Sequence, residues 1–341
     1  MSALYGLLFT KLKLPPASAI HGKTILITGA NTGLGREAAR HALSLGAGAV
    51  ILGVRTLTKG EQAKIDIESS TGCSNKVLVW PIDLESFASV QAFAGKVSKY
   101  VDDGGRLDIA IMNAGFASME WAITGDGWER SLQANVLSTA LLSLELLPVL
   151  LRSAERFPSS SSASTRPHLT IVASDIHRGV KFSERSAGSI LSALNDHERW
   201  KASQGLGGAT ERYAVTKLLD IFITMEIARL APRDERGDPL VIVNSLTPGF
   251  CKSDLLTREK APLLLKVVQA AIARTVEEGS KTLLHAATAG VETHGLWMEN
   301  QAVADPGSIV TDSAMVGVRE KIWKEVVDVL REVNSEIRTE Y

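Results

Sequence analysis

The sequence predicts a single α/β domain built on a doubly wound parallel sheet, and three observations support this fold class. Short apolar, β-branched segments alternate along the chain with amphipathic ones, as in repeated strand–helix units. The short segments are apolar throughout, which is typical of strands buried on both faces of a parallel sheet. The 341 residues, 45% of them hydrophobic, can bury a large core, and no break in composition divides them.

Strands are expected, in chain order, at residues 23–28, 49–55, 76–82, 107–113, 169–174 and 240–246. Amphipathic stretches such as "GREAARHALSLG" and "ESFASVQAFAGKVSKYV" predict helices between them. Thr275 and Glu278 have the spacing of a capping box that opens a later helix. The serine-rich stretch at 158–167 is expected to be a solvated loop rather than a domain linker. The domain therefore spans residues 21–341.

Residues 1–20 are expected to form an N-terminal arm. Here "LYGLLF" is followed by "KLK", whereas a secretion signal places its cations before the apolar run, and this run is too short to cross a bilayer. We expect the arm to pack on the domain and the protein to have no transmembrane segment. The alternative is a helix over residues 2–13 that makes a peripheral membrane contact.

The first predicted strand runs directly into the glycine loop "TGANTGLG", and a helix is expected to start near Arg36. A strand, a glycine loop and a helix together point backbone N–H groups and the positive end of the helix at a pyrophosphate. The loop therefore predicts a dinucleotide cradle, although its spacing, GxxxGxG, differs from GxGxxG and glycines also serve tight turns. The cradle residues are Gly29, Asn31, Thr32, Gly33, Leu34 and Gly35.

The second strand ends at Arg55, twenty residues after Gly35. An NAD site usually places an acidic side chain there, on the ribose 2'-hydroxyl. An arginine instead suits a 2'-phosphate, with Lys59 close by in sequence, so NADP(H) is the expected cofactor. The alternative is an ordinary solvated cation at a strand end.

Tyr213 and Lys217 lie four residues apart in a predicted helix and therefore share one face. A free tyrosine has a pKa of about 10. A neighbouring cation favours the phenolate, so we expect the pKa of Tyr213 to move towards the working pH and the phenol to exchange protons with substrate. Ser174, at the end of the fifth strand, can donate to a substrate oxygen on which negative charge develops.

These motifs, together with "NAG" at 113–115, Asn135 and "PG" at 248–249, resemble the short-chain dehydrogenase/reductase family, particularly its retinol-dehydrogenase-like and fungal reductase members. The resemblance covers residues 21 to about 312 and implies a Rossmann fold. It departs from the family pattern at Ala173, where a second serine usually precedes the catalytic one.

The resemblance also implies roles for individual residues. The catalytic residues would be Asn135, Ser174, Tyr213 and Lys217. Lys217 would also hydrogen-bond to the nicotinamide ribose, and Asn135 would bend its helix and hold a water. Without the other three residues, Asn135 would equally suit a buried amide whose hydrogen bonds are satisfied in the core. The remaining implied cofactor contacts lie in loops that follow strands: Asp83, Leu84, Asn113, Ala114, Gly115, Pro248, Gly249 and Ser253.

Two segments are expected to shape the substrate pocket. Tyr213 follows Ser174 by 39 residues, which implies an insertion at about 176–210. The segment at about 250–275 matches the family's substrate-binding region, and its leucines and valines suit either an apolar pocket or the buried face of an ordinary helix. A bulky lipophilic ketone or aldehyde, such as a polyketide-type natural-product intermediate, is the expected substrate.

Three functions follow from these features. The leading one is an NADPH-dependent carbonyl reductase. The second is an NADP-dependent alcohol dehydrogenase acting on a retinoid- or steroid-like substrate, and the third is a non-catalytic NADP(H)-binding regulator. An intact catalytic set argues against the regulator.

Several classes are excluded or disfavoured. A net charge of -1 argues against a nucleic-acid partner. The two cysteines, Cys73 and Cys251, form no CxxC motif, and the histidines His177, His197 and His294 are scattered along the chain, so no metal site is expected. The low cysteine content favours a reduced compartment, and a cytoplasmic location is expected. The apolar helix at 128–152 could pair in a dimer unless loops cover it, so the chain is expected to be a monomer or homodimer.

Overall fold

The computed structural model describes residues 10–118, 120–157, 166–203, 211–252 and 273–339, and the structural statements below concern these residues. Its centre is one sheet with strand order β3-β2-β1-β4-β5-β6-β7-β8. All neighbouring strands are parallel except β7 and β8, which are antiparallel. The strands are β1 Thr24–Thr28, β2 Ala49–Val54, β3 Val77–Pro81, β4 Ile109–Met112, β5 His168–Val172, β6 Ile242–Thr247, β7 Trp297–Glu299 and β8 Ala302–Val303.

The predicted fold class and the first six predicted strands are confirmed. β1, β5 and β6 are buried at every position, including the polar residues His168, Asn244 and Ser245, because helices cover both faces of the sheet. The sequence did not predict β7 and β8, which have three and two residues and are too short to show a periodicity.

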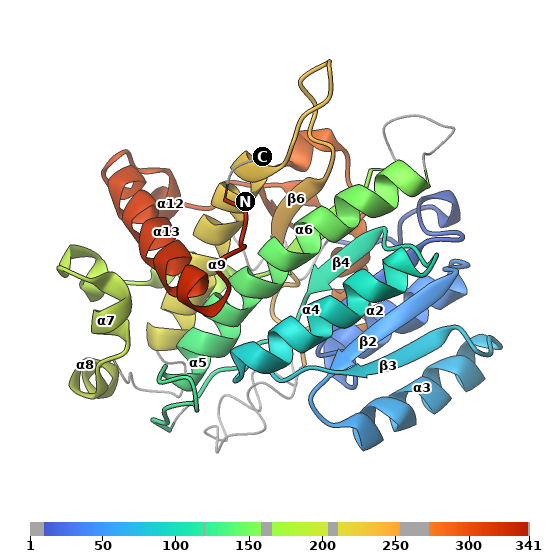
Figure 1. Ribbon diagram of the computed structural model, residues 1–341, viewed down its shortest axis with the longest axis horizontal. Coiled ribbons are helices and arrows are strands. Elements are labelled where there is room, and N and C mark those ends of the chain that lie inside the picture. The colour runs from blue at the N-terminus through green and yellow to red at the C-terminus, as the bar shows by residue number, and fades with distance from the viewer. Residues whose placement is uncertain (1–9, 119, 158–165, 204–210, 253–272, 340–341) are drawn as a thin grey trace.

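Helices cover both faces of the sheet (Figure 1). On one side α4 and α6 pack together and α9 lies against β6, while on the other α2 packs between α3 and α11. The helices are α2 Gly33–Ser44, α3 Leu57–Thr71, α4 Phe87–Asp102, α5 Arg130–Leu132, α6 Ser138–Arg156, α7 Ile190–Leu194, α8 His197–Ala202, α9 Glu211–Leu230, α11 Val276–Ala286, α12 Ser308–Thr311 and α13 Ala314–Val333. Short turns add η1 Ala17–Ala19, the π turn η2 Gln133–Leu137, η4 Asp175–Gly179, η5 Ser183–Ser186 and η6 Val291–Thr293.

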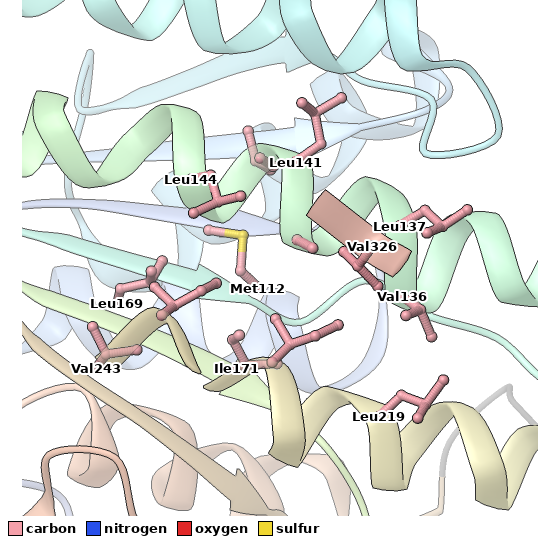
Figure 2. Packing of buried hydrophobic residues seen from close by; sticks show 14 of the residues in the cluster. Met112, Val136, Leu137, Leu141, Leu144, Leu169, Ile171, Leu219, Val243 and Val326 are labelled. Carbon is pink, nitrogen blue, oxygen red and sulfur yellow. The ribbon is translucent and has the colours of Figure 1, made fainter. Parts of the chain in front are cut away.

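The larger core lies between the sheet and the α4, α6 and α9 layer (Figure 2). Leu141 and Leu144 of α6 pack there with Ile171 of β5, and Val326 brings α13 into the same cluster. The helical stretch from Arg130 to Arg156 is long and apolar enough to cross a membrane, but 83% of its apolar window is buried inside the fold, as in a core helix. The apolar face of this helix, which the sequence analysis considered for pairing in a dimer, therefore packs within the chain's own core.

Three other segments bear on the predictions. Of the N-terminal arm, residues 10–20 pack on the domain through buried Leu12 and Ile20, and residues 1–9 lie outside the description. The predicted insertion contains η4, η5, α7 and α8 (Figure 1), and the carboxylate of Glu325 on α13 accepts hydrogen bonds from the first backbone N–H groups of α7. Most of the serine-rich stretch, 158–165, is outside the described residues.

The strand order reverses between β1 and β4. In an open parallel sheet, ligands bind at the carboxyl ends of the strands at such a switch point, because neighbouring connections leave in opposite directions and open a crevice. The glycine loop follows β1 and the "NAG" segment follows β4, so the fold places both at this edge.

Candidate active site

The glycine loop turns the chain from β1 into α2. Gly29 has φ of +68°, a left-handed conformation that side chains with a Cβ rarely adopt. The helix begins at Gly33, earlier than the start near Arg36 that the sequence predicted, because extended Thr32 already ends the loop. The first turn of α2, whose N–H groups have no partner within the helix, therefore consists of glycine-motif residues, and these N–H groups are the ones that can bind an anion.

The "NAG" segment is bonded directly to β1. The Thr28 hydroxyl accepts from the backbone N–H groups of Asn113 and Ala114, each at 3.0 Å, and the Asn113 side-chain amide donates to the Thr28 carbonyl at 2.8 Å. A Cβ added to Gly35 would lie 2.7 Å from the Asn113 amide nitrogen, too close for any side chain. Gly35 is thus needed where the helix start, the loop and "NAG" meet.

A hollow of about 510 Å³ lies beside the start of α2, between α2 and α3. Asn31 and Thr32 of the predicted cradle line it, together with the cationic side chains Arg36 and Lys59. Asp66 also lines it and lies 3.7 Å from the Arg36 guanidinium. The hollow can therefore take an anionic group next to the glycine loop.

Arg55 lies at the end of β2 as predicted, and its guanidinium pairs with Glu85 at 2.9 Å. Glu85 also accepts two hydrogen bonds from Arg130, at 2.6 and 2.8 Å, and these hold the pKa of its carboxyl below the usual value. The Arg55 side chain is 59% exposed and remains accessible to a ligand, although it is paired with Glu85.

Asp83 and Leu84 shape the turn after β3. The Asp83 carboxylate accepts from the Glu85 backbone N–H at 3.0 Å, and the Leu84 carbonyl accepts from the Ser138 hydroxyl at 2.7 Å. These bonds join the turn to the start of α6.

Asn135 lies in the π turn η2 that precedes α6. Its amide donates to the Phe116 carbonyl at 2.8 Å and to the Thr216 hydroxyl at 3.1 Å, and its carbonyl oxygen accepts from the Phe116 backbone N–H at 3.0 Å. A Cβ on Gly115 would lie 3.1 Å from this Asn135 oxygen and 3.4 Å from the Lys217 ammonium. Asn135, Gly115 and Lys217 therefore meet at one point, although they come from three separate segments.

Tyr213 and Lys217 occupy the first turns of α9. The Lys217 ammonium lies 5.8 Å from the centre of the Tyr213 ring and donates to the Val172 carbonyl at 2.9 Å, which ties it to the end of β5. It also donates to the Asp220 carboxylate at 2.9 Å, an ion pair that the sequence reasoning missed.

The expected lowering of the Tyr213 pKa is wrong for the protein as described. Burial raises the pKa of Tyr213, and the carboxylates of Asp220 and Asp175 raise it further, against the opposing effect of Lys217. Burial by itself would lower the pKa of Lys217, but Asp220 and Tyr213 outweigh it and raise that pKa, so the lysine keeps its proton. Because Asp220 pairs with the cation, Tyr213 experiences only part of its charge.

Ser174 follows β5 and begins the turn η4, which packs against α9. Its hydroxyl accepts from the Ile176 backbone N–H and donates to the Asp175 carboxylate, both at 3.4 Å, so neither bond is short. The hydroxyl can therefore turn to a substrate oxygen at small cost.

Pro248 and Gly249 follow β6 at the same edge of the sheet. Gly249 has φ of +75°, and its N–H donates to the Thr247 hydroxyl at 3.1 Å. Ser253 and residues 253–272 of the predicted substrate segment lie outside the described residues. Next to them, burial raises the pKa of the Cys251 thiol to about 12, so this cysteine stays protonated.

The other candidates have structural roles. His177 is buried with both ring nitrogens 2.6 Å from backbone carbonyl oxygens, and no group of histidine, cysteine and acidic residues in the described parts of the chain could hold a metal. Residues that the sequence analysis overlooked are Arg36, Glu85, Asp175 and Asp220. Asp220, three residues after Lys217 in one helix, is the one that helical spacing could have revealed.

Comparison with known proteins finds a family model, relatives and solved structures that are similar to this chain. The family model described as short chain dehydrogenase matches residues 23–156. The short chain dehydrogenase atnD of Emericella nidulans is 41% identical over 88% of this chain and 90% of its own length. The NADPH-bound carbonyl reductase from chicken fatty liver is similar in fold, with a TM-score of 0.57, 21% identity, and coverage of 86% of this chain and 98% of that one.

A second solved structure, 3-ketoacyl-(acyl-carrier-protein) reductase from Brucella melitensis complexed with NADH, has a TM-score of 0.57 and 18% identity. The match covers 82% of this chain and 97% of that one.

Proposed function

Because the chain belongs to the short-chain dehydrogenase/reductase family, we propose that it is an NADPH-dependent carbonyl reductase acting on a bulky lipophilic ketone or aldehyde. The observation that carries the proposal is the meeting of Lys217, Asn135 and Gly115 at the switch point of the sheet, with Tyr213 one helical turn away. This is the edge at which a doubly wound sheet binds dinucleotides.

The residues around the glycine loop suit a dinucleotide. A Cβ would fill the space at Gly35, and the first turn of α2 offers free N–H groups for a pyrophosphate. Asp83, Leu84, the "NAG" segment, Pro248 and Gly249 would hold the rest of the cofactor. The reduced nicotinamide, when bound, supplies the hydride.

A preference for NADP(H) over NAD(H) is supported by charge. Arg36 and Lys59 line the hollow beside the glycine loop, and Arg55 lies exposed at the end of β2. Cations there favour the 2'-phosphate, for which a charge-assisted hydrogen bond would replace part of the Arg55–Glu85 pair.

Side chains of the protein would supply the proton that the carbonyl oxygen takes up during reduction. Tyr213 would donate its phenolic proton to the carbonyl oxygen, and the Ser174 hydroxyl would donate a hydrogen bond to the same oxygen as charge develops on it. Lys217, held by Val172 and Asp220, would keep its positive charge beside the phenol. A raised Tyr213 pKa keeps the phenol in the protonated form that carbonyl reduction needs. Alcohol oxidation remains the second candidate function.

The proposal of a lipophilic substrate, such as a natural-product intermediate, comes from the length of the insertion between Ser174 and Tyr213. The buried residues of α7 are Ile190, Leu191, Ala193 and Leu194. Beside α8 the rings of Trp121 and Trp200 lie edge to face with centroids 5.7 Å apart. The α7 residues and Trp200 are buried, so they hold the segment that follows Ser174 on the fold and do not themselves line an open pocket.

The test follows NADPH absorbance with a panel of lipophilic ketones, using the protein, Tyr213→Phe and the control Tyr100→Phe. Tyr100 packs edge to face on Trp80 and has no part in the site. We expect Tyr213→Phe to lower turnover by about 10²–10⁴-fold while NADPH binding, measured by fluorescence, stays unchanged. NADPH binding without consumption of any ketone by the unmodified protein would instead favour the non-catalytic regulator.

A further inference from the structure

The buried pair between Lys217 and Asp220 lies inside the proposed active site. Both residues come from α9, and their side chains are 5% and 1% exposed. One Asp220 oxygen lies 2.9 Å from the ammonium. The other, Oδ1, is buried without a hydrogen-bond partner among the described residues. The Asp220 carboxylate is therefore held by the lysine alone.

Burying this carboxylate lowers the stability of the fold, so a functional reason for it is expected. Burying a carboxylate removes its hydration. One ion pair offsets this loss of hydration only in part when the second carboxylate oxygen accepts no hydrogen bond. An apolar side chain at this position of α9 would pack in the core without that cost. Asp220 is thus a polar group in a place where stability does not require one.

Charged and titratable groups from α9 and from η4 act on this spot. Tyr213 and Lys217 come from α9 itself, and Asp175 comes from η4, which packs against α9. Asn135 and Thr216 also lie next to Lys217 but are neutral. Among the described residues, Lys217 is a cation that acts on Tyr213, and Asp220 is the carboxylate that touches that cation.

We propose that Asp220 is a positioning residue that fixes Lys217 against the end of β5 and offsets its charge, so that Tyr213 stays protonated over a wider pH range. The inference rests on the proposed function, because it concerns the proton that Tyr213 would give to a carbonyl oxygen. At alkaline pH Asp220 keeps Tyr213 in its proton-donating form, where a tyrosine beside an unpaired lysine would already be ionised.

The acid–base properties of the pair agree with this role. Burial raises the pKa of Asp220 to about 6, with Lys217 acting in the opposite direction. The carboxylate is therefore ionised at neutral pH and offsets the ammonium there. Below about pH 6 it takes up a proton, and Lys217 then acts on Tyr213 unopposed.

The test is the ionisation of Tyr213 in Asp220→Asn, which keeps the shape of the side chain and removes its charge. The chain has four tyrosines, so carbon-13 labelling of the tyrosine ring gives few signals, and Tyr213→Phe identifies the one that belongs to Tyr213. We expect Tyr213 in Asp220→Asn to titrate on the order of one pH unit lower. Asp328→Asn is the matched control, because it breaks an exposed lysine–aspartate pair on α13 and should leave Tyr213 unchanged.

Activity gives a second measurement. With 9,10-phenanthrenequinone as the test substrate, the alkaline limb of the kcat/KM profile should move to lower pH by the same amount in Asp220→Asn. If that variant does not fold, the inference can still be tested on the unmodified protein. The carbon-13 signal of its Tyr213 ring should shift in a step near pH 6 as Asp220 is protonated.

An unchanged Tyr213 titration in folded Asp220→Asn, or no step near pH 6 in the unmodified protein, overturns the inference. These outcomes are independent of catalysis. A protein that reduces no ketone but shows the titration shift contradicts the proposed function alone, and one that reduces ketones without the shift contradicts only the role of Asp220.

Discussion

His168 should make the stability of this protein depend on pH. It is fully buried at the start of β5, and its two ring nitrogens each lie 2.8 Å from a backbone carbonyl oxygen, of Arg166 and of Ala289. Burial lowers its pKa to about 4, because the charged imidazolium loses its hydration there. The folded protein therefore holds His168 neutral under ordinary conditions.

The magnitude follows from the difference between the two states. The unfolded chain takes up a proton at His168 near pH 6.5, whereas the folded protein resists it until about pH 4. The contribution of neutral His168 to the free energy of unfolding is complete above pH 6.5. It is lost as the pH falls from 6.5 towards 4, since between these values only the unfolded chain binds the proton. The full loss in the free energy of unfolding is roughly 3 kcal/mol.

The assay is urea denaturation between pH 7.5 and pH 4.5 of the protein, His168→Gln and the control His197→Gln, whose side chain is exposed. His168→Gln lowers stability at pH 7.5, and its deficit should shrink by roughly 2.5 kcal/mol at pH 4.5. Other titrating groups cancel in the difference, and His197→Gln should run parallel to the unmodified protein. A deficit of His168→Gln that is the same at both pH values would refute the reasoning.

Two further predictions concern the cofactor and a helix cap. Arg55→Asp should reduce the ratio of kcat/KM for NADPH to that for NADH by about tenfold or more, since it replaces a cation near the expected 2'-phosphate with a repelling charge; an unchanged ratio would remove Arg55 from cofactor selection. Thr275→Ala should lower the free energy of unfolding by about 1 kcal/mol, because the Thr275 hydroxyl accepts from the Glu278 backbone N–H at 3.1 Å at the start of α11. Equal urea midpoints for Thr275→Ala and the unmodified protein would argue against the cap.

Local chemistry explains why much of the fold could be predicted. Uninterrupted β-branched segments such as that ending at Thr28 have few alternatives to a buried strand, and the glycine loop after it has a recognisable spacing. The cap at Thr275 was also visible, but only half of the expected capping box forms. The Glu278 carboxylate pairs with Lys281 instead of reaching back to the Thr275 N–H.

Features that depend on distant segments were missed or misjudged. The strand β7 pairs with β6, and Trp297 is buried there only because the rest of the sheet is present to cover it. The ion pair of Arg55 with Glu85 was not foreseen, since Glu85 follows a different strand. Neither outcome has a local signature in the sequence.

The sequence alone therefore determined the fold class, the positions of six strands along the chain, and the presence of a glycine loop, a tyrosine–lysine pair and an asparagine suited to one site. The fold class, the strands, the glycine loop and the tyrosine–lysine pair follow from residue type and spacing, and the role of the asparagine follows from the resemblance to the family. Only the tertiary structure decided how the charges are paired and which way the pKa of Tyr213 moves. The physical reason is that burial and the distance to Asp220 and Asp175 set the energy of a charge, and both arise when α9 packs against the sheet.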